Sequence, residues 1–188
     1  TLKQINYLCE KNNLRVFKVS LNPMYGGSVR VFICHKSAKF KTNFNSIQKC
    51  NKLEKKYVNN KQFLNFKKKI KLLSKKLYSV VKSIVKEKKI IHVCGASTKG
   101  NIILQYSKID KKDISYAADR NPLKWNRKMP GSNIPIVSES NSRLKKPNFY
   151  LVLPWHFKKE FIMREKKFLT NGGRLIFPLP RVQIISKS

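Results

Sequence analysis

The chain is poor in acidic residues and has no long apolar run. Its 188 residues include 9 aspartates and glutamates against 42 lysines and arginines. No apolar stretch approaches the roughly 20 residues that a membrane-spanning helix needs, so a transmembrane protein is not expected. The first residues, TLKQINYLCEKNNL, lack the charged start and the apolar run of a secretory signal peptide. We therefore expect a cytoplasmic location.

Paired cysteines are also missing. Cys34 is followed directly by His35, but no second ligand pair stands at the spacing that structural zinc sites use. We therefore expect no metal site, and isolated thiols in a reducing compartment. The chain's cysteines are Cys9, Cys34, Cys50 and Cys94.

Arginine is scarce although the net charge is +33. So strong a positive field would attract nucleic acid or an anionic membrane surface. Lysine supplies most of the charge, however, and it is spread along the chain together with abundant asparagine and isoleucine. This composition is typical of a genome rich in A and T. We interpret the charge as compositional drift, expect neither nucleic acid nor a membrane as a partner, and keep a nucleic-acid-binding module as the alternative.

The first part of the chain predicts one helix and two strands. Apolar residues recur at helical spacing in 2–13, and apolar and polar residues alternate in 14–21 and 29–36. The segment NPMYGGS between the two alternating runs predicts a loop, so we expect an antiparallel pair of strands. Residues 37–62 are rich in lysine and asparagine and are expected to be partly a mobile linker.

A long amphipathic helix is expected next, from Phe63 to Ile84. Its apolar residues repeat at spacings of three and four, and lysines occupy the opposite face. The stripe is short for a coiled coil, so packing against its own domain is the preferred interpretation. The stripe is also a candidate surface for docking a partner chain.

After Lys89 the pattern changes to short apolar runs that alternate with helical segments. Such alternation predicts a mainly parallel α/β sheet covered on both faces by helices. The tail VQIISKS carries little signal. The expected strands are 90–96, 114–121, 133–138, 148–155 and 174–180, and the expected helices are 97–109 and 157–173.

The turn inside VCGASTKGNIIL, residues 93–104, has the outline of a phosphate-binding strand–turn–helix. Gly95 and Gly100 flank the turn, and Asp119 lies at the distance of the acid that holds a ribose in dinucleotide folds. The middle glycine of the dinucleotide motif is missing, however, and Lys99 precedes the last glycine, which excludes a Walker A loop. A stand-alone NAD-dependent enzyme is therefore a weaker alternative.

Two interpretations of the polar residues in this turn stay open. Lys99 can meet a phosphate as a point charge, and Ser97 or Thr98 can be an ordinary helix N-cap. Similarly, Asp119 to Pro122 is either the edge of a basic pocket or a turn that caps a strand.

Five separated segments resemble one family. Together they are similar to the C-terminal domain of bacterial S-adenosylmethionine-dependent sugar C-methyltransferases, and the resemblance covers nearly the whole chain in order. The segments are YGGSVRVF at 25–32, GASTKGNIILQY at 95–106, DRNPLKWNRKMPGSNIPI at 119–136, LPWHFKKE at 153–160 and GGRLIFPLP at 172–180.

The resemblance implies a role inside a larger enzyme. Members of this family methylate a carbon of a nucleotide-linked keto-deoxysugar and combine a zinc-binding domain, a central methyltransferase domain and a Rossmann-like C-terminal domain. The zinc ligands, the glycine-rich S-adenosylmethionine loop and the Glu-His pair implicated in deprotonation are absent here. The expected divisions are the end of the central domain at 1–36, a linker and long helix at 37–89, and the Rossmann-like domain at 90–188.

The resemblance also implies which ligands this chain meets. S-adenosylmethionine is expected to bind outside this chain, which would hold no cofactor and no catalytic residue and would not transfer methyl groups alone. The expected partners are a nucleotide-diphosphate sugar and a chain that carries the S-adenosylmethionine domain. A decayed, non-functional fragment is a further alternative.

The candidate substrate-binding residues lie in the glycine turn and at the expected strand ends. The family commonly has histidine where this chain has Tyr25 and asparagine where it has His156, so these two contacts depart from the family pattern. Trp125, Trp155 and His92 are expected to be packing residues. The candidates are Tyr25, Gly26, Gly27, Ser28, Arg30, Ser97, Lys99, Asn101, Arg120, Lys124 and His156.

Overall fold

The computed structural model describes residues 1–23 and 27–187. The chain divides into two compact units, Thr1–Lys67 and Lys68–Ser188, and each is described by itself. Tyr25 and Gly26 of the candidate set lie outside the described residues. Across the described ranges, no helix combines the length and the apolar character that crossing a membrane requires.

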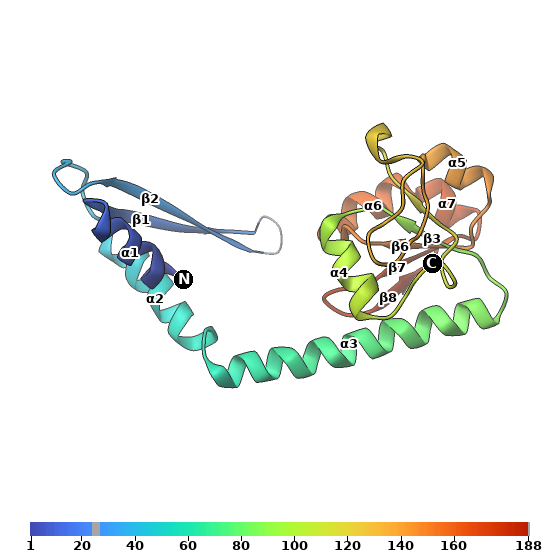
Figure 1. Ribbon diagram of the computed structural model, residues 1–188, viewed down its shortest axis with the longest axis horizontal. Helices are drawn as coiled ribbons and strands as arrows, with labels where there is room; N and C mark the ends of the chain where they lie inside the picture. The colour runs from blue at the N-terminus through green and yellow to red at the C-terminus, as the bar shows by residue number, and fades with distance from the viewer. Residues whose placement is uncertain (24–26, 188) are drawn as a thin grey trace. The chain divides into compact units, whose positions relative to one another are not determined.

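The first unit is an antiparallel strand pair covered by two helices (Figure 1). The expected pairing of two strands is present, with Val19 opposite Val31 and a one-residue irregularity between Val16 and Lys18. Leu2, Cys9 and Cys50 of the helices pack against Val16 and Val19. The elements are α1 (Leu2–Lys11), β1 (Leu14–Asn22), β2 (Ser28–His35) and α2 (Phe44–Tyr57).

Residues 44–57 form helix α2, although their composition predicted a linker. Asn43 caps the helix, because its side chain accepts a hydrogen bond from the Ser46 N–H at 3.0 Å. Ile47 and Cys50 then point into the core of the unit. The apolar positions are few and their neighbours are lysine and asparagine, so the polar composition concealed the helical spacing.

The second unit is built on a six-stranded sheet in the order β5-β4-β3-β6-β7-β8. All neighbouring strands are parallel except β7 and β8, which are antiparallel. The last strand lies in the tail where the sequence gave no signal, because a short edge strand has too few residues to show alternation. The strands are β3 (Ile91–Cys94), β4 (Tyr116–Ala118), β5 (Ile136–Val137), β6 (Phe149–Val152), β7 (Arg174–Phe177) and β8 (Gln183–Ile185).

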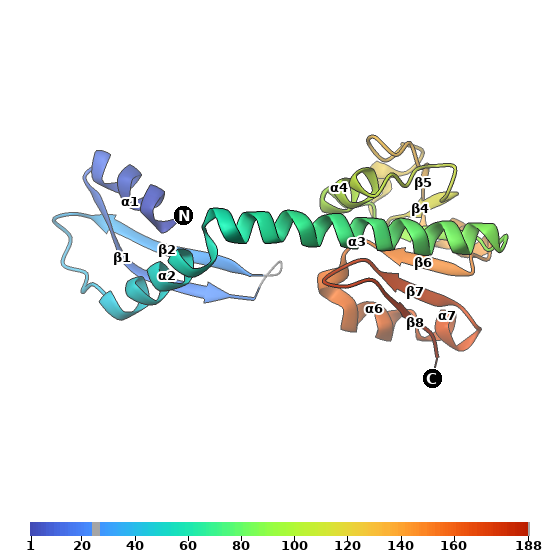
Figure 2. The same ribbon diagram turned by 90° about the horizontal axis from the view of Figure 1, so that it is seen from below.

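Helices cover both faces of this sheet, as Figure 1 and Figure 2 show. The α3 and α4 side chains pack on the face to which Val93 points, and those of α6 and α7 pack on the face of Cys94. Short 3-10 turns follow β4 and β6. The elements are α3 (Asn60–Lys86), α4 (Thr98–Tyr106), η2 (Pro122–Lys124), α5 (Glu139–Leu144), η3 (Trp155–Phe157), α6 (Lys158–Arg164) and α7 (Lys166–Thr170).

The single helix expected at 157–173 is divided into η3, α6 and α7. The last break falls at Glu165, whose buried carboxylate accepts two hydrogen bonds from Arg143 and one from Arg164. Burying this acid with its partners fixes the chain direction at the break, because an unpaired buried carboxylate is costly.

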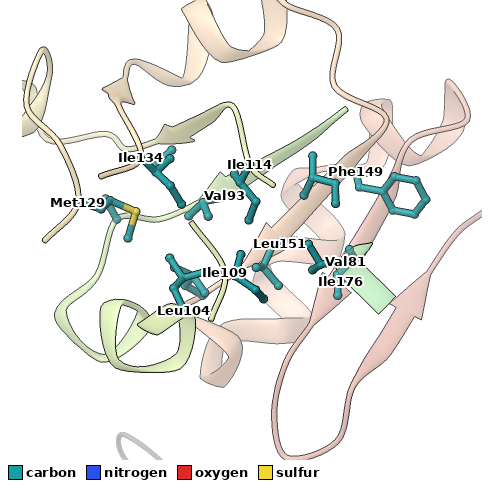
Figure 3. Close-up of a cluster of buried hydrophobic side chains, with 14 of the residues drawn as sticks. Val81, Val93, Leu104, Ile109, Ile114, Met129, Ile134, Phe149, Leu151 and Ile176 are labelled. Atoms are coloured by element: carbon teal, nitrogen blue, oxygen red, sulfur yellow. The ribbon is translucent and has the colours of Figure 1, made fainter. Parts of the chain in front are cut away.

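The main core lies between α3, α4 and the sheet, as Figure 3 shows for ten of its labelled side chains. Leu77 and Val81 of α3 are 1% and 0% exposed, and they pack with Val93 and Leu151 of the strands. The predicted stripe of α3 is thus buried in its second half. Near its start, Phe63 is 56% exposed.

Candidate functional site

The carboxyl ends of β3, β4 and β6 meet at one edge of the sheet, because these neighbouring strands are parallel. The segments that leave this edge are the turn at 95–97, the turn and 3-10 helix at 119–125, and η3 at 155–157. Ligands of open α/β sheets bind outside such an edge, where the connections diverge to opposite faces. Six of the candidate residues belong to these segments and to the first turn of α4.

The two glycines of the turn serve the packing of the protein itself. Gly95 has a φ of +85°, and a Cβ added there would lie 2.6 Å from Cγ of Pro154. A Cβ on Gly100 would lie 2.5 Å from Cδ1 of Leu153. Both positions therefore lack side chains because β6 and the residue after it press against the turn. The glycine pattern that resembles a phosphate loop is used inside the fold.

Ser97 is the N-cap of α4. Its Oγ accepts a hydrogen bond from the Gly100 N–H at 3.1 Å, which satisfies one of the amide donors that every helix start leaves unpaired. Of the two interpretations of this residue, the structure supports the cap, and Ser97 is a positioning residue for α4.

Asp119 is bound by the protein on both carboxylate oxygens. Oδ2 accepts hydrogen bonds from the Ala96 N–H at 2.9 Å and from Lys124 Nζ at 3.0 Å, and Oδ1 accepts one from the Asn121 N–H at 2.9 Å. Lys124 also donates to the Ala96 carbonyl at 2.9 Å. These bonds join the turn after β3 to the turn after β4. The acid at the ribose position is thus engaged, and Lys124 is a clamp between two turns.

The residues after Asp119 form a capped turn. Asn121 accepts a hydrogen bond from the Leu123 N–H at 3.0 Å, and Pro122 starts the 3-10 helix η2. The Trp125 indole N–H donates to the Asp119 carbonyl at 2.8 Å. The strand-capping interpretation of this segment is therefore correct, and Trp125 takes part in it.

His156 lies beside Lys99 and Trp155. The imidazole stacks on the Trp155 indole with ring centroids 4.1 Å apart and planes 29° apart. Partial burial, and secondarily the positive charge of Lys99, lower the pKa of His156. The ring is therefore neutral at pH 7 and offers one hydrogen-bond donor and one acceptor. Lys99 and His156 are two candidates that the fold does bring together.

Asn101 carries an unsatisfied polar atom. Its Oδ1 is buried on α4, and within residues 1–23 and 27–187 it has no hydrogen-bond partner. An acceptor buried without a partner costs about 1–3 kcal/mol, so natural proteins seldom keep one without a use. Asn101 lies two residues after Lys99 in the first turns of α4. It is the polar group of this edge that the fold leaves available for a ligand.

Arg120 points toward α5. Its Nε lies 3.4 Å from Glu139 Oε1, and the side chain is 68% exposed. Glu139 also pairs with Arg164, which in turn contacts Glu165. This chain of ion pairs was not predicted, because its members are up to 45 residues apart in a sequence without any periodic signal for them.

Three candidates belong to the first unit and form a separate group. Ser28 and Arg30 alternate along β2 and so share one face of the strand pair. The Ser28 hydroxyl donates to Asn22 Oδ1 at 2.6 Å, which holds the serine within its own hairpin. Gly27 has a φ of +118°, a conformation that favours glycine. Arg30 is exposed.

His92 is a packing residue, as expected. It is buried in β3, and its Nδ1 lies 2.8 Å from the Ser142 hydroxyl, which lies 2.9 Å from the Tyr150 hydroxyl. Burial, with a smaller contribution from the charge of Lys145, lowers the pKa of His92 to about 4. The buried neutral imidazole stabilises the fold and has no access to a ligand.

The cysteines are buried thiols. Burial raises the pKa of Cys94 to about 12, so it does not form a reactive thiolate. Cys9, Cys34 and Cys50 are likewise buried and make no disulfide. In the part of the chain that the structure describes, no three histidine, cysteine or acidic side chains gather in a way that could hold a metal ion.

Comparison with known proteins agrees with this geometry. Residues 23–180 match the family model described as the C-methyltransferase C-terminal domain. The chain is also 37% identical over 107 residues to C-methyltransferase NovU of Streptomyces niveus. The matched region is 57% of this chain and 26% of NovU, so the chain spans about a quarter of the length of this curated relative.

Proposed function

Because the chain belongs to the C-methyltransferase C-terminal domain family, we propose that it is the substrate-side part of a C-methyltransferase acting on a nucleotide-linked keto-deoxysugar. The observation that carries the proposal is the state of the carboxyl edge of the sheet. Asp119 and the glycines are used by the fold, whereas Asn101 keeps a buried acceptor without a described partner. The edge is thus suited to a neutral, hydroxyl-rich group next to a phosphate.

The strand order supports a Rossmann-like interpretation of the second unit. The order β5-β4-β3-β6-β7 is the order 3-2-1-4-5 of doubly wound sheets, with β3 as the first strand of the series. In such sheets the ligand crosses the point where the order reverses. Here that point lies between β3 and β6, whose ends carry the 95–97 turn and His156.

The cofactor of the family does not fit this edge. S-adenosylmethionine supplies the methyl group to the full enzyme, and Rossmann-type sites hold such a cofactor with an open glycine turn and an acid for the ribose. Here the turn is packed against Leu153 and Pro154, and Asp119 is engaged by Ala96 and Lys124. We propose that the cofactor binds outside this chain.

The reaction divides the work between domains. Methylation of a carbon next to a ketone needs a base, a group that stabilises the enolate and a methyl donor in line with the carbon. This chain's proposed part is to hold the substrate. Lys99 meets the diphosphate as a point charge, Asn101 bonds a hydroxyl, and neutral His156 offers a donor and an acceptor.

A partner domain completes the enzyme in this proposal. The first turns of α3 carry exposed apolar residues, including Phe63 and Phe66 at 56% and 63% exposure, next to exposed lysines. We propose that a chain or segment carrying the S-adenosylmethionine domain docks there. The proposed location of the assembly is the cytoplasm, where nucleotide sugars are made.

Titration with a thymidine-diphosphate sugar tests the assignment of residues. We expect Lys99→Ala and Asn101→Leu each to weaken binding about tenfold, which is the loss of one charge-assisted or buried hydrogen bond. Lys111→Ala is the matched control, because it removes an exposed lysine elsewhere on the same unit. Equal affinity of all four proteins would show that the sugar nucleotide does not bind at this edge.

A further inference from the structure

A second cavity lies at the opposite end of the same sheet. It has a volume of about 600 Å³ and is lined by residues of α5 and α7 and by the segments that lead into β6 and β7. Asn148 stands directly before β6, and Gly173 directly before β7. The cavity is therefore at the amino ends of these strands, whereas the candidate site is at the carboxyl ends.

The polar groups of this cavity are mostly without partners. Lys146 and Lys167 line it, and in the described part of the chain neither ammonium group makes a hydrogen bond or an ion pair. The Asn171 side chain lines it in the same state. Arg143 also lines it, but its guanidinium is held by Glu165 through two hydrogen bonds of 2.8 and 3.0 Å. No carboxylate is among the described lining residues, so the cavity has a net positive charge.

The floor of the cavity is aromatic. The rings of Tyr150 and Phe168 lie 4.8 Å apart at 58°, and Gly173 leaves room for the Phe168 ring, which a Cβ there would overlap. The Tyr150 hydroxyl is bonded to Ser142, so the ring rather than the hydroxyl faces a ligand. A partly exposed aromatic floor below two cations suits a ligand that has both a planar ring and a negative charge.

We propose that this cavity binds a nucleoside monophosphate. The phosphate lies between Lys146 and Lys167, the base lies against Phe168, and Asn171 bonds a polar edge of the base. The volume supports an organic phosphate over a bare phosphate ion, because small-molecule sites measure about 300–1,000 Å³. Nothing in the C-methyltransferase proposal requires this site, since the two groups of residues are at opposite ends of the strands.

Calorimetric titration of the 188-residue chain with adenosine monophosphate tests the proposal, with adenosine and inorganic phosphate in parallel. We expect the monophosphate to bind at least tenfold more tightly than either part alone, because the base and the phosphate both contribute. The double variant Lys146→Glu with Lys167→Glu is expected to weaken binding at least tenfold. The matched control is Lys159→Glu with Lys166→Glu, which makes the same change of charge on α6 and α7 outside the cavity.

The control variant separates a site from diffuse attraction to the positive surface. Equal weakening in both double variants would show that the monophosphate responds only to total charge and would overturn the proposal. Absence of heat with the wild type would do the same. Lys99→Ala is expected to leave monophosphate binding unchanged, so failure of this site can be told from failure of the sugar-nucleotide site.

Discussion

Lys124 Nζ lies 3.0 Å from Asp119 Oδ2 and 2.9 Å from the Ala96 carbonyl, and so it joins the turns that follow β3 and β4. The pair lies at the place where a dinucleotide-binding sheet would present a free acid. Here the acid accepts the Ala96 N–H instead. The relationship explains why the turn has the outline of a phosphate loop without its ligand chemistry.

Loss of Asp119 should destabilise the second unit more than loss of Lys124. Asp119→Ala leaves the buried Ala96 N–H without its acceptor, and we expect a cost of about 2 kcal/mol. Lys124→Ala removes a cation with a 40% exposed side chain, and we expect less than about 1 kcal/mol because solvent screens it. Urea unfolding followed by tryptophan fluorescence measures both, since Trp125 and Trp155 lie in this unit. Equal costs would contradict the clamp.

A side chain at Gly100 should strain the fold directly. Gly100→Ala places a Cβ 2.5 Å from Cδ1 of Leu153, and overpacking of this kind costs about 1–3 kcal/mol. In a double-mutant cycle with Leu153→Ala, the two costs should be less than additive, because the second change removes the overlap. Strict additivity would mean that the glycine is kept for another reason, such as close approach of a ligand.

The buried half of α3 should carry its stability. Leu77 is 1% exposed in the main core, and Leu77→Ala should cost about 2–5 kcal/mol. Leu72→Ala is the matched control, because Leu72 lies on the same helix and is 69% exposed. We expect its cost to stay within about 0.5 kcal/mol. Similar losses for both would show that α3 is stabilised along its length and not by this core.

Stability should fall as the pH falls through the titration range of His92. The pKa of His92 is lowered from 6.5 to about 4, so between these values the unfolded chain binds a proton that the folded chain does not. Stability is therefore complete above pH 6.5 and decreases toward pH 4, by about 3 kcal/mol in total. His92→Gln should flatten the curve between pH 6.5 and 5, above the usual range of carboxylates. His35→Gln, at an exposed position, should leave it unchanged.

The sequence predicted the features that repeat along the chain. Alternation predicted β1 and β2, and the spacing of three and four predicted α3, because burial imposes these periods. Helix α2 was concealed by lysine and asparagine around Ile47 and Cys50. Strand β8 was missed because Gln183–Ile185 is too short for alternation to show.

The candidate site was predictable in its members but not in their roles. The expected strand ends placed Lys99, Asn101 and His156 at one edge, since parallel strands end together. The partners of Asp119 could not be predicted, because Ala96 is 23 residues away and the bond depends on how two turns meet. The second cavity gave no signal either, since its lining comes from separate segments before and after β6.

The central claim is that the carboxyl edge holds a nucleotide sugar and not a dinucleotide or S-adenosylmethionine. Calorimetric titration of the chain with a thymidine-diphosphate sugar, NAD and S-adenosylmethionine, each at low and moderate salt, measures this most directly. We predict binding of the sugar nucleotide that persists at moderate salt and is weakened by Asn101→Leu, with no heat from the other two ligands. Binding of NAD or S-adenosylmethionine, or sugar-nucleotide binding that disappears with salt, would contradict the account.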